Sequence, residues 1–514
     1  MKNKTGKNSF LGGAVILTAS VTLSKIMGML YRLPLAKTLG SFGLGLYQTV
    51  FPIYALLVCV GSSAVTTAVS RCVAEHTAER NASKVKGTLK SATLFSFAFT
   101  FLSALALFIF SPEISALQGV SEATLLYKCI APSIVFAGLS GVIRGYFQGQ
   151  MNMTPTALSE IVFQSAKPLF ALTFSSFFSD AYKKAVFAVL SVTFGELLSL
   201  ILLSATFLCE VKSKPFPCGY AEKEKGFYSV LLPVALSGVL LPLSNATDSF
   251  WVINSLKNYT EHAVGLYGTF TGVCLTVLSI PASLSYGLAV AVLPSLSALL
   301  KRGEKDKAKK GEYVALTLTV YVSLPITAFL YVFAPNVISV LFRTGNAHEF
   351  GVLVKMIKLA SPYAVFLPVL QTANAVLYGK GKGAFAPVAV TTGLFFKIAV
   401  MSVLLKNPSL NIFGYIIAVD VCYILAVFVD LVYIIREIGF VVFVLKTAVV
   451  SAIAVYTGYA VYAYLGFFVA CVLAVTVYFG GTVAFKLYGK EEIGFLTGKL
   501  KGNERNATRN VKNR

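Results

Sequence analysis

Long apolar runs without polar alternation constrain the fold of this chain more than any other feature of its sequence. A helix needs about 20 mostly apolar residues to cross a bilayer, and lipid offers no partner for backbone polar groups, so spanning segments must satisfy them internally. Only 13% of the 514 residues are charged and the mean hydropathy is +0.76, whereas soluble domains carry about 25% charged residues. The sequence therefore predicts an all-α polytopic membrane protein.

Charged or Pro/Gly breaks divide the apolar sequence into about fourteen predicted transmembrane helices. They cover residues 8–30, 43–66, 87–110, 123–147, 155–178, 185–208, 228–254, 264–294, 313–334, 351–378, 384–405, 411–434, 441–463 and 465–487. The first run follows three lysines as a signal peptide would, but it is long, so we expect a retained helix. Basic residues gather in alternate breaks and in the tail 488–514, which predicts that both termini are cytoplasmic.

An internal repeat organises the chain. The hexapeptide GLYQTV at Gly45–Val50 recurs as GLYGTF at Gly265–Phe270, and APSIVF at Ala131–Phe136 recurs as SPYAVF at Ser361–Phe366. The first match relates predicted helix two to predicted helix eight, and the second relates helix four to helix ten. The repeat unit is therefore six helices, and both copies begin on the same side of the membrane.

The repeat predicts two pseudo-symmetric six-helix lobes around a central cavity. The first lobe covers residues 1–227 and the second covers 228–440. Residues 441–487 form an appended pair of helices without a counterpart in the repeat, and 488–514 form a basic cytoplasmic tail.

Charged side chains within the first lobe are candidate substrate-binding residues, because a charge at the bilayer centre costs at least about 2.5–3.5 kcal/mol and normally faces a cavity or a partner. Lys25 and Arg32 are seven residues apart and share one face of the first helix. Glu160 and Lys167 belong to a polar stripe on the fifth helix, and Arg144 closes the fourth. Such a basic group suits a pyrophosphate, which Arg can bind in bidentate fashion and Lys as a point charge.

Structural roles compete with this interpretation. Arg32 lies near the outer end of its helix and can snorkel to lipid headgroups. Arg144 lies near the inner end, where it can set topology or pair between helices. Lys167 can pair with Glu160 or Glu196 to hold helices together.

The second lobe offers candidates for ion coupling. Asn245 and Asp248 are one turn apart, and their oxygens can hold Na⁺ or a proton. Lys397 and Asp420 lie within two later spans. The structural alternatives are an Asp248–Lys397 pair or a Lys397–Asp420 pair.

Several functional classes are excluded. The net charge of +22 could suggest nucleic acid, but the basic residues separate apolar runs and do not form a soluble basic surface. The eight Cys form no CxxC pair and the three His are far apart, so no metal site is predicted. Without a Walker motif, energy must come from a Na⁺ or H⁺ gradient, the membrane potential or the substrate gradient. The short outer loops lack the paired carboxylates of a membrane glycosyltransferase, so we expect no enzyme and no cofactor.

Three segments carry a resemblance to a known family. They are SKIMGMLYRLPLAKTLGSFGLGLYQTVFPIYAL at Ser24–Leu56, AVSRCVAE at Ala68–Glu75 and GYFQGQMNMTPTALSEIVFQ at Gly145–Gln164. Over essentially its full length the sequence resembles the stage V sporulation protein B group of polysaccharide-biosynthesis transporters. This group belongs to the multidrug/oligosaccharidyl-lipid/polysaccharide exporter superfamily, together with the lipid II flippases and the multidrug-and-toxin extruders.

The resemblance implies a flippase of the cytoplasmic membrane. It implies alternating-access export of an undecaprenyl-pyrophosphate-linked glycan precursor, such as lipid II, for the cell wall or the spore cortex. Expected partners are that substrate, membrane lipids and the cell-wall synthesis machinery. By position Lys25 and Arg32 match the first-helix basic pair of the lipid II branch, and Asp248 matches its cation site, but residues 42–64 contain none of the branch's second-helix arginines. The alternative function is a cation-coupled multidrug exporter of the related extruder type.

Overall fold

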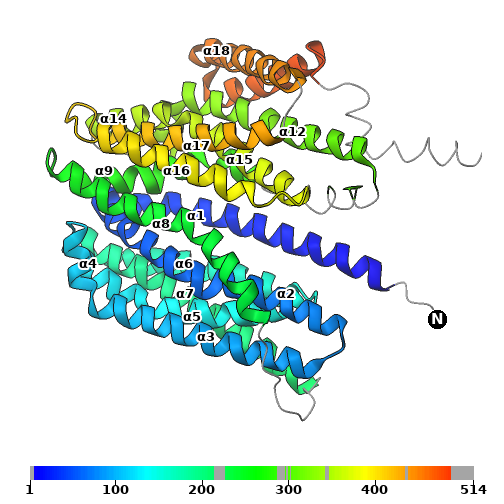
Figure 1. The fold of residues 1–514 in the computed structure, drawn as a ribbon. Coiled ribbons are helices and arrows are strands. Elements are labelled where there is room, and N and C mark those ends of the chain that lie inside the picture. Colours follow the sequence, from blue (N-terminus) through cyan, green and yellow to red (C-terminus); the bar gives the residue numbers. More distant parts are fainter. Residues whose placement is uncertain are drawn as a thin grey trace, which may run out of the picture. The chain divides into compact units, whose positions relative to one another are not determined.

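The computed structural model describes residues 5–213, 226–285, 296, 299–300, 303–341, 347–434 and 438–487. These residues form helices joined by short turns, and no strand occurs among them (Figure 1). Helix packing divides the chain into two compact units, residues 1–277 with 398–415 and residues 278–397 with 416–514. The lobes predicted from the repeat, 1–227 and 228–440, follow a different division and stay a prediction.

The first unit contains eleven complete helices from the N-terminal part of the chain and all but the last residue of a further short helix. Their bounds are α1 Thr5–Val58, the π-helix η1 Cys59–Ala64, α2 Val65–Ala78, α3 Ala82–Ile109, α4 Ser111–Leu117, α5 Ala123–Gly149, α6 Thr154–Ser175, α7 Ala181–Ser213, α8 Gly226–Lys257, α9 Ala263–Thr269, the π-helix η2 Phe270–Cys274 and α10 Leu275–Leu278. Within this unit α5 packs against α2, α3 and α7, and α6 packs against α7 and α1.

The second unit contains the remaining described helices, except that the end of α16 (398–404) and the start of α17 (412–415) belong to the first unit. Their bounds are α12 Lys305–Val332, α13 Ala334–Leu341, α14 Ala347–Leu359, α15 Ser361–Gly379, α16 Phe385–Leu404, α17 Ile412–Ile434 and α18 Ile438–Ala484. Here α12 packs against α15 and α18, and the hydroxyl of Tyr478 in α18 donates a hydrogen bond to the carbonyl of Tyr321 in α12 (2.7 Å).

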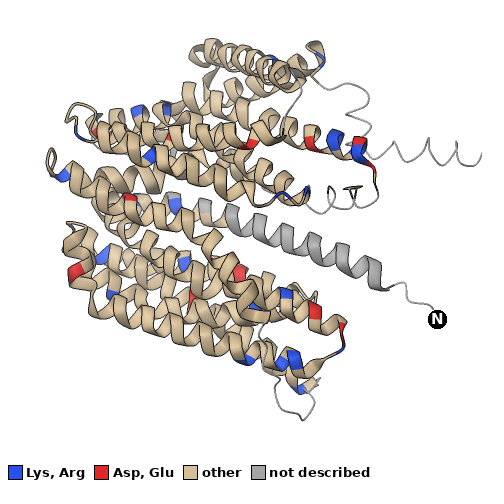
Figure 2. Cartoon of the chain, in the orientation of Figure 1, with Lys and Arg blue, Asp and Glu red and all other residues tan. Residues whose placement is uncertain are grey.

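Most of the long helices have the length and composition of membrane spans, but α6 is not among them. Among the described residues, nine helices are long and apolar enough to cross a bilayer, or ten if His348–Leu359 and Ser361–Gly379, bent by 41°, form one span. Figure 2 shows that the helix bodies carry few charged residues. The prediction of an all-α polytopic membrane protein is therefore confirmed, whereas the total of fourteen spans stays a prediction.

Two glycines break the longest helices. Gly40 in α1 has a φ of 67° and Gly466 in α18 has a φ of 80°, a backbone region that other residues rarely enter. Both α1 and α18 are therefore two helices joined at a kink. Gly40 lies in the predicted break between the first and second spans, and Gly466 lies next to the predicted break between the last two.

Residues from the two copies of the repeat contact each other in the first unit. Gly45 of α1 and Gly268 of α9 bring the two helix backbones together, and a Cβ atom on Gly268 would overlap the backbone of Gly45. Close packing of small residues is a common way to join helices in lipid. The sequence repeat thus marks a contact between helices about 220 residues apart in the chain.

Candidate functional site

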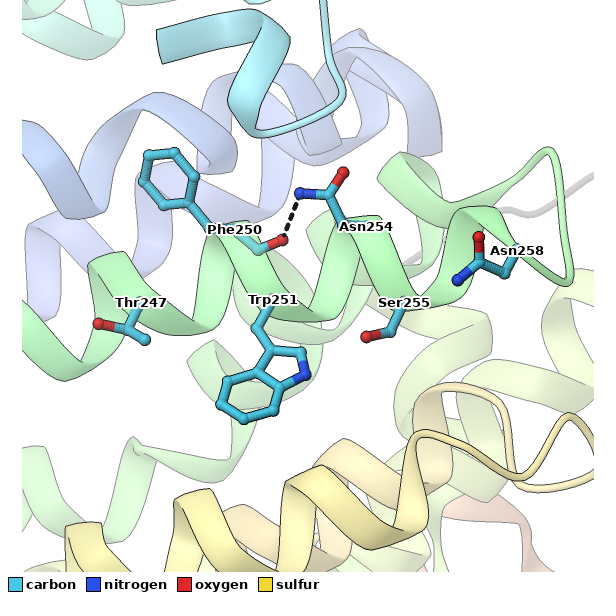
Figure 3. Close-up of a pocket in the computed structure, with 6 residues that line it drawn as sticks. All are labelled: Thr247, Phe250, Trp251, Asn254, Ser255 and Asn258. Carbon is cyan, nitrogen blue, oxygen red and sulfur yellow. Dashed lines mark hydrogen bonds between the residues drawn. The ribbon is translucent and has the colours of Figure 1, made fainter.

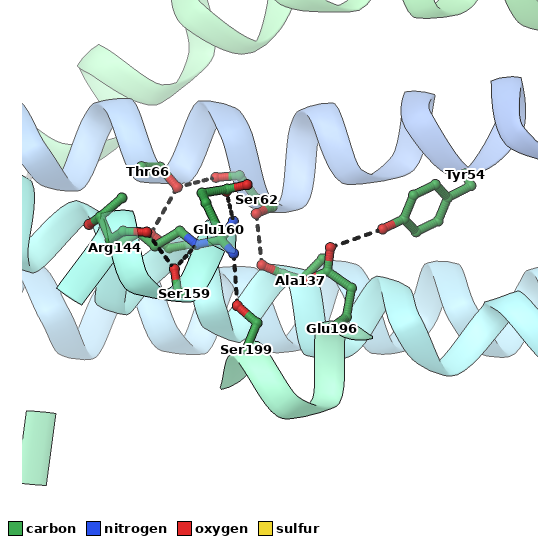
Figure 4. Close-up of polar contacts among 11 residues, drawn as sticks. Tyr54, Ser62, Thr66, Ala137, Arg144, Ser159, Glu160, Glu196 and Ser199 are labelled. Atoms are coloured by element: carbon green, nitrogen blue, oxygen red, sulfur yellow. Dashed lines mark hydrogen bonds and ion pairs between the residues drawn. The ribbon is translucent and has the colours of Figure 1, made fainter. Parts of the chain in front are cut away.

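Glycines on α5 fix this helix against α2. Gly141, Gly145 and Gly149 recur every four residues, and a Cβ atom on Gly145 would lie 2.8 Å from the carbonyl oxygen of Thr66. A Cβ atom on Gly149 would lie 2.7 Å from that of Ser70. The Thr66 hydroxyl also donates to the Gly141 carbonyl (2.9 Å; Figure 4). This backbone contact makes α5 a rigid support for its polar side chains.

Arg144 extends from α5 toward α6 and α7. Its Nη1 atom lies 2.9 Å from Oε1 of Glu160, its Nε donates to the hydroxyl of Ser159 (3.2 Å), and its Nη2 donates to the hydroxyl of Ser199 (2.9 Å). Figure 4 shows the guanidinium surrounded by these three side chains. The Arg144 and Glu160 side chains are 14% and 29% exposed. Two of the predicted substrate-binding residues therefore form an ion pair between α5 and α6, and the hydrogen bond from Arg144 to Ser199 adds α7.

Lys167 lies two turns beyond Glu160 on α6. Its Nζ donates to Oε1 of Gln164 (3.1 Å) and lies 4.9 Å from the ring centre of Phe163 and 5.4 Å from that of Tyr31 in α1. These contacts are cation–π interactions. Within the part of the chain that the structure describes, Lys167 forms no ion pair, so neither predicted acidic partner makes a direct contact with it.

Arg32 connects α1 to the residues after η2. Its Nη1 donates to the hydroxyl of Thr276 (3.2 Å), and its side chain is exposed. Arg32 is close enough to Lys167 for the two positive charges to repel each other. Lys25 belongs to the same helix, but its side chain lies outside the described residues.

Glu196 of α7 lies near these residues. The sequence suggested it only as a partner for Lys167. Its side chain is buried, and its Oε1 accepts a hydrogen bond from the hydroxyl of Tyr54 in α1 (3.3 Å; Figure 4). In the sequence, the feature that could have indicated this role is a glutamate within the apolar run of α7. Glu196 precedes Ser199 by about one turn. We define the basic cluster as Arg32, Arg144, Glu160, Lys167 and Glu196.

The ion-coupling candidates of the first unit lie on α8. Asp248 is 1% exposed, and its Oδ2 accepts a hydrogen bond from the hydroxyl of Tyr415 (3.0 Å). Asn245, one turn before it, is exposed. The two side chains therefore differ in environment although they are on one helix.

The ion-coupling candidates of the second unit are both buried. Lys397 of α16 is 4% exposed and Asp420 of α17 is 7% exposed. Oδ1 of Asp420 accepts a hydrogen bond from the backbone N–H of Tyr363 at the start of α15 (3.1 Å). Among the described residues no group of three His, Cys, Asp or Glu side chains is arranged to hold a metal ion.

A separate surface pocket lies along α8. It has a volume of about 400 Å³ and is lined by Thr247, Phe250, Trp251, Asn254, Ser255 and Asn258 (Figure 3). The Asn254 side chain donates to the carbonyl of Phe250 one turn earlier (2.9 Å). The lining contains no charged side chain, so the basic cluster remains the better candidate site for an anion.

Solved structures of membrane transporters share this fold. The structure described as lipid II flippase MurJ in an inward closed conformation matches with a TM-score of 0.69 and 16% identity, covering 92% of this chain and 98% of that chain. An inward-facing multidrug resistance MATE family transporter of the MOP superfamily matches with a TM-score of 0.63 and 15% identity, covering 82% and 97%. At these identities the similarity establishes the fold.

Curated relatives match over most of their length. Stage V sporulation protein B of Bacillus subtilis is 28% identical over 429 residues, covering 80% of this chain and 81% of the relative. Lipid II flippase MurJ of the same organism is 21% identical over 537 aligned positions, covering 95% and 96%. These relatives agree with the prediction that the chain is a membrane transporter and not an enzyme.

The family comparison covers the residues of the basic cluster. The family described as "Polysaccharide biosynthesis protein" matches residues 10–300, which include Arg32, Arg144, Glu160, Lys167 and Glu196. The resemblance read from the sequence is thereby confirmed. Because the match extends over more than half of the 514 residues, the chain belongs to the polysaccharide biosynthesis protein family.

Proposed function

We propose that this protein is a flippase that carries a lipid-linked, pyrophosphate-bearing glycan precursor across the cytoplasmic membrane. The observation that supports this most is Lys167, a half-buried cation on α6, a span predicted from the sequence, that forms no ion pair with any described residue. Placing such a charge in a membrane is costly, so a role that requires it is expected. The family membership and the relatives named for a lipid II flippase and for sporulation support the same function.

The other groups of the basic cluster suit a pyrophosphate. Arg32 is exposed and adds a second positive charge. Arg144 is neutralised by Glu160, so it holds the helices in place until an anion competes for its guanidinium. Arg binds phosphate oxygens in bidentate fashion and Lys binds as a point charge. We therefore assign Lys167 and Arg32 to the first contact with the headgroup.

Transport by this protein follows an alternating-access scheme in our proposal. The two lobes predicted by the repeat, 1–227 and 228–440, open in turn to each side, and both termini face the cytoplasm. The proposed ion-coupling residues are Asp248 with the neighbouring Asn245, together with Lys397 and Asp420. Asp248, Lys397 and Asp420 are buried, which supports this assignment, whereas Asn245 is exposed.

Export of cationic drugs is the rival function, supported by the fold shared with a multidrug transporter. The charge of Lys167 beside Arg32 disfavours it, because like charges repel. A cationic probe such as tetraphenylphosphonium therefore should not stabilise the purified protein. Stabilisation by that cation, without any by an anionic lipid, would favour the rival.

Binding of undecaprenyl pyrophosphate tests the proposal. A ligand at 100 times its Kd stabilises a protein by about 2.7 kcal/mol, so the unfolding midpoint of the wild type should rise with this lipid but not with undecaprenol. Loss of a charge-assisted hydrogen bond costs about 1.5–3 kcal/mol, so Lys167→Ala should weaken binding by about 10- to 100-fold.

Lys183→Ala is the matched control for Lys167→Ala. Lys183 also faces an aromatic ring, that of Phe178 at 6.0 Å, but it is exposed at the start of α7. The Lys183→Ala variant should therefore bind the pyrophosphate lipid as the wild type does. Equal stabilisation by undecaprenol, or equal binding by Lys167→Ala and the wild type, would contradict the proposed anion site.

A further inference from the structure

We propose that Glu196 is a proton-binding site, and that its proton and an anionic headgroup in the basic cluster bind cooperatively. The second half of this inference rests on the proposed flippase function. None of the ion-coupling candidates on α8, α16 and α17 is involved, so this site is distinct from them.

No described residue in contact with Glu196 carries a positive charge that would compensate its carboxylate. The side chain is 6% exposed, and Oε1 accepts one hydrogen bond, from Tyr54. Oε2 has no hydrogen-bond partner among the described residues, and Glu196 forms no ion pair with any of them. A buried carboxylate in such a setting loses its hydration without a compensating partner, which costs several kcal/mol. Binding a proton removes that cost.

The neighbouring cations have other partners. Tyr54 of α1, Arg144 of α5, and Glu160 and Lys167 of α6 are the titratable or charged groups within electrostatic range of Glu196. Arg144 directs its three donor groups to other side chains, and Lys167 donates to Gln164. Neither cation therefore makes a direct contact with the Glu196 carboxylate, while Glu160 adds a like charge nearby.

The charge of the cluster determines the sign of the coupling. With Glu196 ionised, the charges of Arg144 and Lys167 are cancelled by those of Glu160 and Glu196. With Glu196 protonated, one net positive charge remains beside Arg32. An anion therefore binds the protonated form more tightly, and by linkage the anion also promotes protonation. The affinity for a pyrophosphate lipid should fall as pH rises through the titration of Glu196.

Infrared spectroscopy of the full-length protein tests the proton site without any substrate. The wild type at neutral pH should show the carbonyl stretch of a protonated carboxyl group that is missing from Glu196→Gln. Glu113→Gln, at an exposed position in the short helix α4, is the control and should retain the band. Absence of a band assignable to Glu196 would overturn the inference.

The pH dependence of undecaprenyl pyrophosphate binding tests the coupling. Coupling free energies between sites usually change affinity by about 5- to 150-fold, so wild-type affinity should fall by about tenfold from acidic to alkaline pH. Glu196→Gln, which stays neutral, should bind tightly throughout. Glu196→Asp keeps a titratable carboxyl and should retain a pH dependence. The same slope in Glu196→Gln and the wild type would overturn the coupling.

The two measurements separate this inference from the proposed function. Normal lipid binding without a Glu196 band overturns the proton site alone and leaves the flippase proposal in place. A Glu196 band without lipid binding at any pH contradicts the flippase proposal and overturns the coupling.

Discussion

Arg144→Ala is expected to abolish transport and to lower the free energy of unfolding by about 1.5–3 kcal/mol, the usual cost of losing a hydrogen bond to a charged group, because the ion pair is partly buried. The loss arises because Glu160 keeps its charge after its 2.9 Å partner is gone. The hydroxyls of Ser159 and Ser199 lose their donors as well. Chemical denaturation of the purified variant in detergent measures the change in stability.

A double variant separates stability from transport in this experiment. Arg144→Ala combined with Glu160→Ala removes both charges, so it should recover most of the lost stability but not the transport. Arg71→Ala is the matched control, because the Arg71–Glu75 pair is exposed and such pairs contribute only about 0–1 kcal/mol. An Arg144→Ala protein as stable as the wild type would show that the pair does not hold α5, α6 and α7 together.

Gly268→Ala is expected to reduce transport by more than tenfold and to destabilise the protein. The new Cβ atom would overlap the backbone of Gly45, so α1 and α9 must separate, and overpacking of this kind costs about 1–3 kcal/mol. Each 1.4 kcal/mol changes an equilibrium constant by about a factor of ten. A cost of this size is therefore enough to shift the balance between the conformations of the transport cycle.

Gly265→Ala is the control for this contact. It lies one turn earlier on α9, and its nearest neighbour would be the Cβ of Ser41 at 3.5 Å, an ordinary van der Waals distance. Thermal unfolding and transport should therefore stay close to wild type. Wild-type behaviour of Gly268→Ala would show that the two repeat copies do not need this close approach.

Sequence patterns predicted the fold class and part of the cluster because both depend on local composition. The long apolar runs indicated membrane helices, and charges inside those runs indicated Arg144, Glu160 and Lys167. The sequence also predicted a break that contains Gly40 and another next to Gly466.

Contacts between distant helices could not be predicted in the same way. Arg32 and its partner Thr276 are 244 residues apart, and Tyr54 and Glu196 are 142 apart, so no local pattern connects them. The sequence offered two acidic partners for Lys167, yet its described partners are an amide and two aromatic rings. Which of several possible partners a charge selects depends on helix rotation, and the sequence alone does not determine that rotation.

Translocation of fluorescent lipid II in proteoliposomes tests the central claim most directly. Wild type, Lys167→Ala and Lys183→Ala are compared at equal insertion, with a pH or Na⁺ gradient and without one. The account predicts movement between leaflets by the wild type and Lys183→Ala, and at least a tenfold loss in Lys167→Ala. Equal movement by all three proteins, or no movement by the wild type under any gradient, would contradict it.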